Sequence, residues 1–313
     1  MSTFDHFIDT SMTDTLWVSA ARRIYSRKLF EADWKLVYEF EDNVIAIDHT
    51  GEIIKKASPV ILVLLASGKV FYSIDKGNSW QLFETDQPVT SIAAIKRYYD
   101  SEDTEDTEEK NLGDMQSVFL LSNNRIRCYA ISENLNFVFK GDIAPVAASS
   151  IHGFRDELLF ISSNSRDTPI IYTYREGQGI KKNAVSCPLR KVRGLVNFNN
   201  SPALLLNWGK VVMLRFPETS ILYPYKDGSK CDFPYPNRID DMMCMDTIPY
   251  TLLDTGEMYV GHPDLGWEKV RMPWDENGTD ASQRDELSEM YENGQRLLVS
   301  IIAHDIGLGS LVP

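Results

Sequence analysis

The chain has 313 residues and a formal net charge of -13 at pH 7, and 43% of its residues are hydrophobic. This composition is ordinary for a globular protein, and no apolar run approaches the roughly 20 residues that a membrane-spanning helix needs. The acidic balance argues against attraction of the whole surface to nucleic acid or to anionic membranes. We therefore expect neither membrane insertion nor direct nucleic-acid binding.

The amino-terminal stretch is polar and contains only isolated apolar residues, Phe4, Phe7 and Ile8. It has no basic region followed by an apolar core, so no secretory signal is predicted. None of the four cysteines has CxxC spacing, and two of them, Cys128 and Cys244, lie in apolar strand-like runs. Reduced structural thiols of this kind predict a cytoplasmic or nuclear protein.

A basic group of residues follows in the first quarter of the chain. Its members are Arg22, Arg23, Arg27, Lys28, Lys55 and Lys56. We interpret them as solvated strand edges and turns, because Lys and Arg discourage pairing at sheet edges.

The stretch Val60–Phe83 predicts three antiparallel strands. Two β-rich runs are joined at Ser67-Gly68, and a polar turn leads to a third run. Glycine accepts the positive φ that such turns need. The turn has the sequence Ser73-Ile-Asp75-Lys-Gly77-Asn-Ser79-Trp80, which matches the Asp-box pattern S-x-D-x-G-x-[ST]-W at every position. We expect Asp75 to accept backbone N–H groups and Trp80 to pack beneath the turn.

The pattern of an apolar run, a turn and an alternating run recurs along the chain. The first apolar residues after each turn are Ile24, Val70, Ile126, Ile171, Val211 and Met258, at steps of 46, 56, 45, 40 and 47 residues. An aromatic residue follows nine to eleven positions later in four units, as Trp34, Trp80, Phe137 and Trp267. A period near 45 residues with three or four short strands predicts an all-β fold, a single β-propeller domain over residues 1–313. Six blades are expected, with seven as the alternative.

The long step contains an acidic segment, residues 100–112, that begins with Asp100–Lys110 (DSEDTEDTEEK). A block of like charge cannot bury apolar area, so a disordered insertion is predicted. It is a candidate docking segment for a basic partner or a phosphorylated segment, and a purely solubilising insertion is the alternative. A second basic group lies beyond it: Lys181, Lys182, Arg190, Lys191 and Arg193.

The loop Tyr223–Pro236 carries four aromatic residues next to prolines: Tyr223, Tyr225, Phe233 and Tyr235. Rigid aromatic side chains lose little entropy on binding and are efficient interface anchors. Two hypotheses stay open, a partner-binding surface and a plug of the propeller channel.

Residues 275–294 predict a loop with a short helix, Ser282–Glu292, on which Leu287, Met290 and Tyr291 share one face. This face is a second candidate for partner binding. The last apolar run, Leu297–His304, predicts a strand that completes the first blade beside Leu16–Phe40 and closes the ring.

Two family resemblances follow from these motifs. The segment Ser73–Trp80 resembles the Asp-boxes of sialidases and related propeller hydrolases. No Arg-Ile-Pro occurs, so the arginine cluster of sialidases is not carried over. The segment Thr251–Gly261 (TLLDTGEMYVG) is similar to the core of the regulator-of-chromosome-condensation repeat, although its Gly-Gln-Leu-Gly segment is missing. Both resemblances imply a β-propeller.

No catalytic or metal-binding motif stands out, since the five histidines are scattered and no nucleotide-binding loop occurs. We therefore predict no cofactor, no metal and no catalytic residue. The expected function is that of an intracellular protein-interaction scaffold, a non-catalytic subunit of a larger complex with one or more protein partners. The alternative is an Asp-box propeller hydrolase or a glycan-binding protein of the sialidase kind.

Overall fold

All regular elements that the structure describes are β-strands. The computed structural model describes residues 15–28, 33–50, 59–95, 116–132, 135–143, 147–154, 157–162, 169–185, 192–198, 201–206, 211–214, 220–222, 239–245, 248–253, 255–262, 266–272 and 298–302. Within these ranges there are twenty-four strands and no helix.

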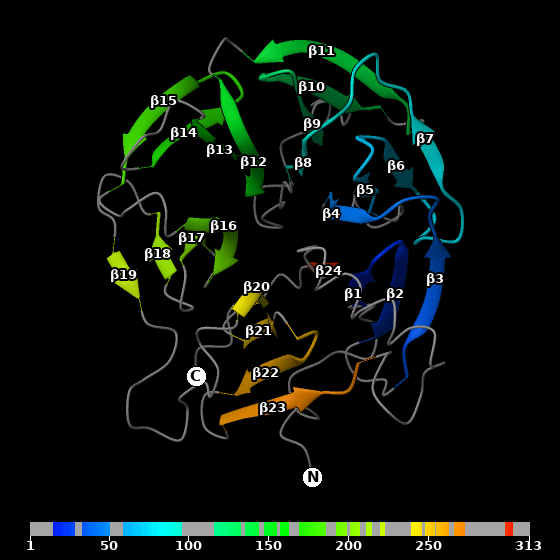
Figure 1. Ribbon diagram of the computed structural model, residues 1–313. Helices are drawn as coiled ribbons and strands as arrows, with labels where there is room; N and C mark the ends of the chain where they lie inside the picture. Colours follow the sequence, from blue (N-terminus) through cyan, green and yellow to red (C-terminus); the bar gives the residue numbers. More distant parts are fainter. Residues whose placement is uncertain are drawn as a thin grey trace, which may run out of the picture.

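The strands form six antiparallel sheets of four strands each, which we number as blades 1 to 6 (Figure 1). From the centre outward, blade 1 contains β24 (Leu298–Ile302), β1 (Thr15–Ala20), β2 (Arg23–Lys28) and β3 (Lys35–Glu39). Blade 2 contains β4 (Val44–His49), β5 (Ile61–Leu65), β6 (Val70–Ser73) and β7 (Gln81–Phe83). Blade 3 contains β8 (Ser91–Ala94), β9 (Ser117–Ser122), β10 (Arg125–Ile131) and β11 (Phe137–Ile143).

The other three blades repeat this plan. Blade 4 contains β12 (Ala148–Phe154), β13 (Glu157–Ser162), β14 (Ile170–Arg175) and β15 (Gly179–Ala184). Blade 5 contains β16 (Val192–Phe198), β17 (Ser201–Leu206), β18 (Val211–Met213) and β19 (Ser220–Leu222). Blade 6 contains β20 (Ile239–Met245), β21 (Ile248–Leu253), β22 (Met258–His262) and β23 (Gly266–Val270).

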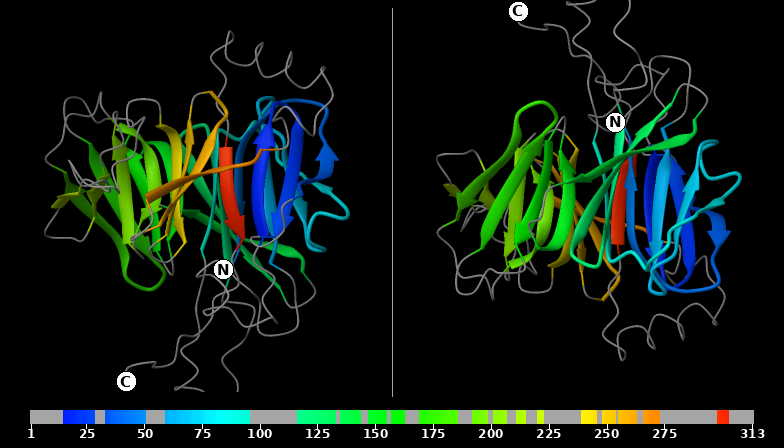
Figure 2. Two further views of the ribbon diagram at one scale, coloured as in Figure 1. Left: turned by 90° about the horizontal axis from the view of Figure 1, so that it is seen from below. Right: turned by 90° about the horizontal axis from the view of Figure 1, so that it is seen from above.

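The innermost strands contact one another around the whole centre, in the order β24, β4, β8, β12, β16, β20 and back to β24. The blades therefore radiate from a common axis, and Figure 2 shows the resulting disc from its edge. In blade 1 the innermost strand comes from the far end of the sequence. β24 pairs antiparallel with β1, from Thr15 opposite Ile302 to Ser19 opposite Leu298.

The second strand of each blade explains the continuous apolar runs in the sequence. All five residues of β5 are buried, and so are all six of β9. A strand in this position contacts a neighbouring blade on each face of its sheet, so both of its faces need apolar side chains. Third strands such as β6 are buried less completely, since Val70 and Ser73 are buried and the two residues between them are half-buried.

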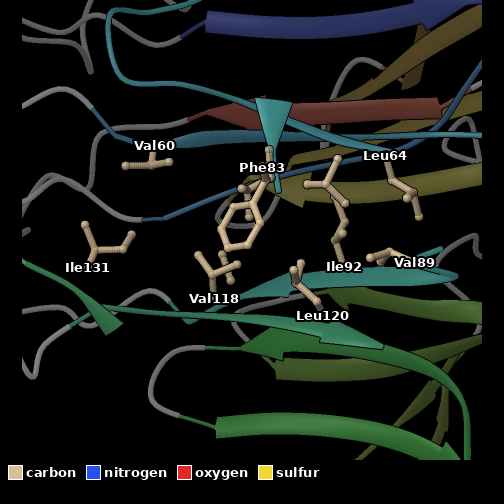
Figure 3. Close-up of a cluster of buried hydrophobic side chains, with 11 residues drawn as sticks. Val60, Leu64, Phe83, Val89, Ile92, Val118, Leu120 and Ile131 are labelled. Atoms are coloured by element: carbon tan, nitrogen blue, oxygen red, sulfur yellow. The ribbon is translucent and has the colours of Figure 1, made fainter. Parts of the chain in front are cut away.

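The hydrophobic core is divided among the six junctions between neighbouring blades. Figure 3 shows the junction of blades 2 and 3, where Leu64 and Phe83 from blade 2 meet Ile92, Val118 and Leu120 from blade 3. The other five clusters join the remaining pairs of neighbours in the same way. Each blade is therefore stabilised by its two neighbours rather than by a core of its own.

The predicted all-β propeller is confirmed. The strands expected over residues 60–83 form as β5, β6 and β7. The total number of blades and closure by the carboxyl-terminal strand stay predictions, which a truncation tests below. The predicted acidic insertion at 100–112 lies outside the described residues, as does the predicted loop with a helix at 275–294.

Candidate functional site

The residues predicted to bind a partner lie outside the part of the chain that the structure describes. They are Tyr223, Tyr225, Phe233, Tyr235, Leu287, Met290 and Tyr291. Their assignment stays a prediction. The described surface offers three other regions for analysis, which are the turn between β6 and β7, the outer strands of the blades and the innermost strands.

The side chains of Ser73 and Asp75 hold the turn between β6 and β7 together. Asp75 Oδ1 accepts hydrogen bonds from Ser73 Oγ at 2.8 Å and from Ser79 N at 2.9 Å, and Asp75 Oδ2 accepts one from Ser79 Oγ at 2.6 Å. Ser73 Oγ in turn accepts a hydrogen bond from Gly77 N at 2.8 Å. Trp80 Nε1 donates to Gly77 O at 3.1 Å. Both carboxylate oxygens of Asp75 are therefore used within the turn.

The charge of Asp75 is stabilised by these contacts. Partial burial alone would raise the pKa of Asp75, but the hydrogen bonds from Ser79 and Ser73 outweigh it and hold the pKa below its ordinary value. A carboxylate with a lowered pKa stays ionised at neutral pH and is a poor general acid. The chemistry of the turn is thus that of a structural anchor.

The turn also fastens blade 2 to blade 1. A Cβ atom built on Gly77 would lie 2.6 Å from the Trp17 ring and 2.7 Å from Val37 Cγ1, both in blade 1. The Trp80 ring lies with its centroid 5.2 Å from that of Phe40 and 6.1 Å from that of Tyr38. Because the turn is shaped to bring Gly77 and Trp80 onto blade 1, its function is contact between blades.

The same aromatic position serves this purpose in other blades. Trp34 packs against the core shared by blades 6 and 1, and Trp80 packs against that of blades 1 and 2. Phe137 packs between blades 2 and 3, and Trp267 between blades 5 and 6. The recurring aromatic residue of the sequence therefore lies in or just before the outer strand of its blade and packs against the preceding blade.

Of the six large apolar side chains that are exposed among the described residues, five lie on the outer strands of three consecutive blades, and the sixth, Ile45, lies on the innermost strand β4. Leu36 and Tyr38 lie on β3, Leu82 lies on β7, and Val138 and Phe139 lie on β11. Each is between 40% and 55% exposed, and the three strands follow one another along one side of the ring (Figure 1). We call these five residues the outer apolar wall.

A set of packed aromatic rings supports this wall from inside. Phe137 lies 4.7 Å from Phe83 and 4.8 Å from Tyr72, measured between ring centroids, and thereby joins blades 2 and 3. Tyr129 lies 5.0 Å from Phe83 and 5.4 Å from the exposed Phe139. Aromatic pairs at these distances are favourable beyond their buried area. Phe139 is thus an exposed ring at the end of a fixed aromatic series.

The described outer strands of blades 4 and 6 expose charged residues and no large apolar side chain. Lys181 and Lys182 of the second basic group are exposed on β15, and Glu268 and Lys269 are exposed on β23. The outer apolar wall was not predicted from the sequence. A usable signal was present, because Phe137-Val138-Phe139 places apolar side chains on both faces of a fourth strand, where only the inner part of one face contacts a neighbour.

The innermost strands of blades 2, 3 and 4 are joined by polar contacts. Asp48 Oδ2 on β4 accepts a hydrogen bond from Ala94 N on β8 at 2.9 Å. Ser91 Oγ on β8 accepts one from Ile151 N on β12 at 3.3 Å. A Cβ atom built on Gly153 of β12 would lie 1.7 Å from Ala94 O, so only glycine permits this approach. These contacts join the innermost strands of blades 2, 3 and 4, and the polar groups named here hydrogen-bond to one another.

The described residues contain no group of three or more His, Cys, Asp or Glu side chains that could hold a metal ion. They also contain no helix long and apolar enough to cross a membrane. The one cysteine whose side chain is described, Cys128, is a reduced thiol on β10. Catalytic residues are not identified among the described side chains, and the exposed wall is the distinctive feature of this surface.

This fold and these inter-blade contacts define a β-propeller. A chain in the crystal structure of a nidogen–laminin complex superposes with a TM-score of 0.56 at 12% identity, over 92% of this chain and 98% of that one. A structure of YCF48 bound to a D1 peptide matches with a TM-score of 0.46 at 12% identity, over 84% and 82%. No family model and no curated protein matches the sequence. The nidogen–laminin likeness concerns the fold alone.

Proposed function

We propose that this β-propeller is a protein-interaction domain that acts as an intracellular scaffold, a non-catalytic subunit of a larger complex in the cytoplasm or nucleus. The observation that carries the proposal is the outer apolar wall. Exposed large apolar side chains on neighbouring outer strands offer a partner apolar area, and burial of that area against the partner is favourable.

The wall has two further properties of a binding surface. Its residues lie on strands, and the aromatic series behind Phe139 fixes that ring before a partner arrives, which reduces the entropy lost on binding. The outer strands of blades 4 and 6, which expose no large apolar side chain among the described residues, provide a control surface. The nidogen–laminin structure gives an example of this fold in a protein complex, and that analogy is one of fold only.

The hydrolase alternative finds less support in the described residues. The Asp75 carboxylate is fully engaged in its own turn, and the turn faces blade 1 rather than a ligand site. A hydrolase of the sialidase kind would need Arg, Glu and Tyr side chains that converge at the mouth of the channel.

The test compares two surface variants of equal size. Val138→Thr with Phe139→Ser changes the wall, and Lys181→Ser with Lys182→Ser changes the charged side. Proteins that co-purify with the tagged wild type from native extract are identified, and binding of the purified candidate is measured by calorimetry. We expect the wall variant to bind at least about tenfold more weakly and the lysine variant to bind normally. A folded wall variant with unchanged affinity would refute this surface.

A further inference from the structure

Arg27, near the end of β2, is half-buried and has no acidic partner among the described residues. Arg22, Arg23, Arg125, Arg127 and Arg175 each form an ion pair with a carboxylate. No ion pair or hydrogen bond of the Arg27 guanidinium is found in the described parts of the chain, and its Nε is buried without a hydrogen-bond partner. The sequence analysis placed Arg27 among solvated basic residues, but the structure half-buries it.

The surroundings of Arg27 are aromatic. Its guanidinium carbon lies 5.0 Å from the centre of the Trp34 ring, a cation–π contact. Trp34 is held in place, since its Nε1 donates a hydrogen bond to Arg271 O at 2.6 Å and its ring packs against the core between blades 6 and 1. Burial lowers the pKa of Arg27, and the nearby Tyr250 partly opposes this shift. The cation is therefore partly stripped of water but not neutralised by a neighbour.

The propeller does not need a cation at this position. Counting three residues onward from the aligned apolar residue of each repeat gives Arg27 in blade 1. The corresponding residues of the other blades are Ser73, Tyr129, Tyr174, Leu214 and Gly261. None of them is charged. An arginine that is half-buried without a partner costs stability, because its hydration is lost and its donors are not fully satisfied. A ligand that supplies the missing acceptors accounts for its presence.

We propose that Arg27 and Trp34 form a binding site for a carboxylate group, contributed by an Asp or Glu side chain of a protein partner. The planar guanidinium offers two parallel N–H donors to the two oxygens of a carboxylate. The fixed Trp34 ring, which the guanidinium contacts, orients these donors. The choice of a protein as the source of the carboxylate rests on the proposed function. The carboxylate site itself does not, so the two can fail separately.

The first experiment uses no partner. The indole N–H signal of Trp34, assigned with Trp34→Phe, is followed by NMR during titration with a glutamate residue capped at both ends. Capped glutamine is the neutral control, and acetate tests a free carboxylate. We expect a saturable shift with capped glutamate, none with capped glutamine, and at least about tenfold weaker binding in Arg27→Gln. If neither capped glutamate nor acetate causes a saturable shift, the proposed carboxylate site is wrong. Tighter binding of acetate than of capped glutamate would overturn the protein source.

The second experiment measures thermal stability without ligand. Because Arg27 is unpaired, we expect Arg27→Met to melt at the same temperature as the wild type or higher. Arg23→Met is the matched control, and it should melt lower, since Arg23 Nε donates to Glu39 Oε2 at 3.1 Å. If Arg27→Met melts as low as the control, Arg27 is already paired within the chain and the proposal is wrong.

Discussion

Gly77 on the turn after β6 rests against the indole ring of Trp17 on β1, and no side chain fits between them. The contact places the turn of blade 2 directly on the most buried strand of blade 1, and Gly77 adopts a φ of 82° to do so. The residue at position 77 must therefore adopt a left-handed backbone conformation and must also lack a Cβ atom.

We expect Gly77→Ala to lower the free energy of unfolding by about 2–4 kcal/mol, since it adds backbone strain and a clash with Trp17 and Val37. Chemical denaturation measures this change. The matched control is Gly177→Ala in the turn between β14 and β15, where φ is 77° and nothing lies within 4 Å of the added Cβ. The control should lose only about 1 kcal/mol. Equal losses in the two variants would show that the Trp17 contact is unimportant.

Asp75→Ala should lower the free energy of unfolding by about 1–3 kcal/mol at pH 7, because three hydrogen bonds to the carboxylate are lost. The pKa of Asp75 is lowered in the folded protein, so its contribution is fully present above the unfolded pKa of about 3.9. It is lost as the pH falls through the folded pKa.

The stability difference between wild type and Asp75→Ala should therefore stay constant from neutral pH to about pH 5 and shrink below about pH 4. Denaturation curves across this range measure it. Partner binding, corrected for the folded fraction, should not change. Weaker binding at an unchanged melting temperature would assign Asp75 to a functional site.

Removal of residues 295–313 tests closure of the ring. It deletes β24, so the inner edge of β1 loses its partner, and β20 and β4 lose a shared neighbour. Unpaired strand edges promote aggregation, and we expect aggregated or unfolded protein. The control ends the chain after residue 304 and keeps β24. A soluble truncation at 295 that melts cooperatively would show that the carboxyl-terminal strand is peripheral.

The pair Phe233→Ala and Tyr235→Ala tests the aromatic loop predicted from sequence. If these rings bind a partner, their truncation should preserve the fold and weaken binding by roughly thirtyfold, which corresponds to about 2 kcal/mol. Calorimetric binding and the melting temperature are measured together. A variant that melts far below the parent would identify the rings as an internal plug, and the helix face of Leu287, Met290 and Tyr291 would be the next surface to test.

The blade pattern was predictable because every repeat obeys the same physical constraint. A second strand between two blades must be apolar on both faces, which is why runs such as Ile61–Leu65 stand out in the sequence. The turn at Ser73–Trp80 was also readable, since its side chains bond within eight residues.

The candidate sites were harder to predict because they join distant parts of the chain. Arg27 and Trp34 are close in sequence, but residues distant in the chain interact with them. The Arg271 carbonyl accepts the Trp34 hydrogen bond, and Tyr250 of blade 6 partly opposes the lowering of the Arg27 pKa by burial. The outer apolar wall likewise depends on which fourth strands lie next to one another. In the sequence, Arg27 belongs to a group of basic residues that were all interpreted as solvated. The alignment of the repeats is the sequence feature that separates Arg27 from this group, because the corresponding residues of the other blades are uncharged.

The pairing of β1 with β24 also determines when the protein can finish folding during its synthesis. Blades 2 to 6 are each built from one continuous segment, so each can form its sheet soon after it leaves the ribosome. Blade 1 cannot, because its outer three strands are made first and its innermost strand is made last. Until β24 has been made, the inner edge of β1 lacks its partner strand, and an open strand edge of this kind promotes aggregation.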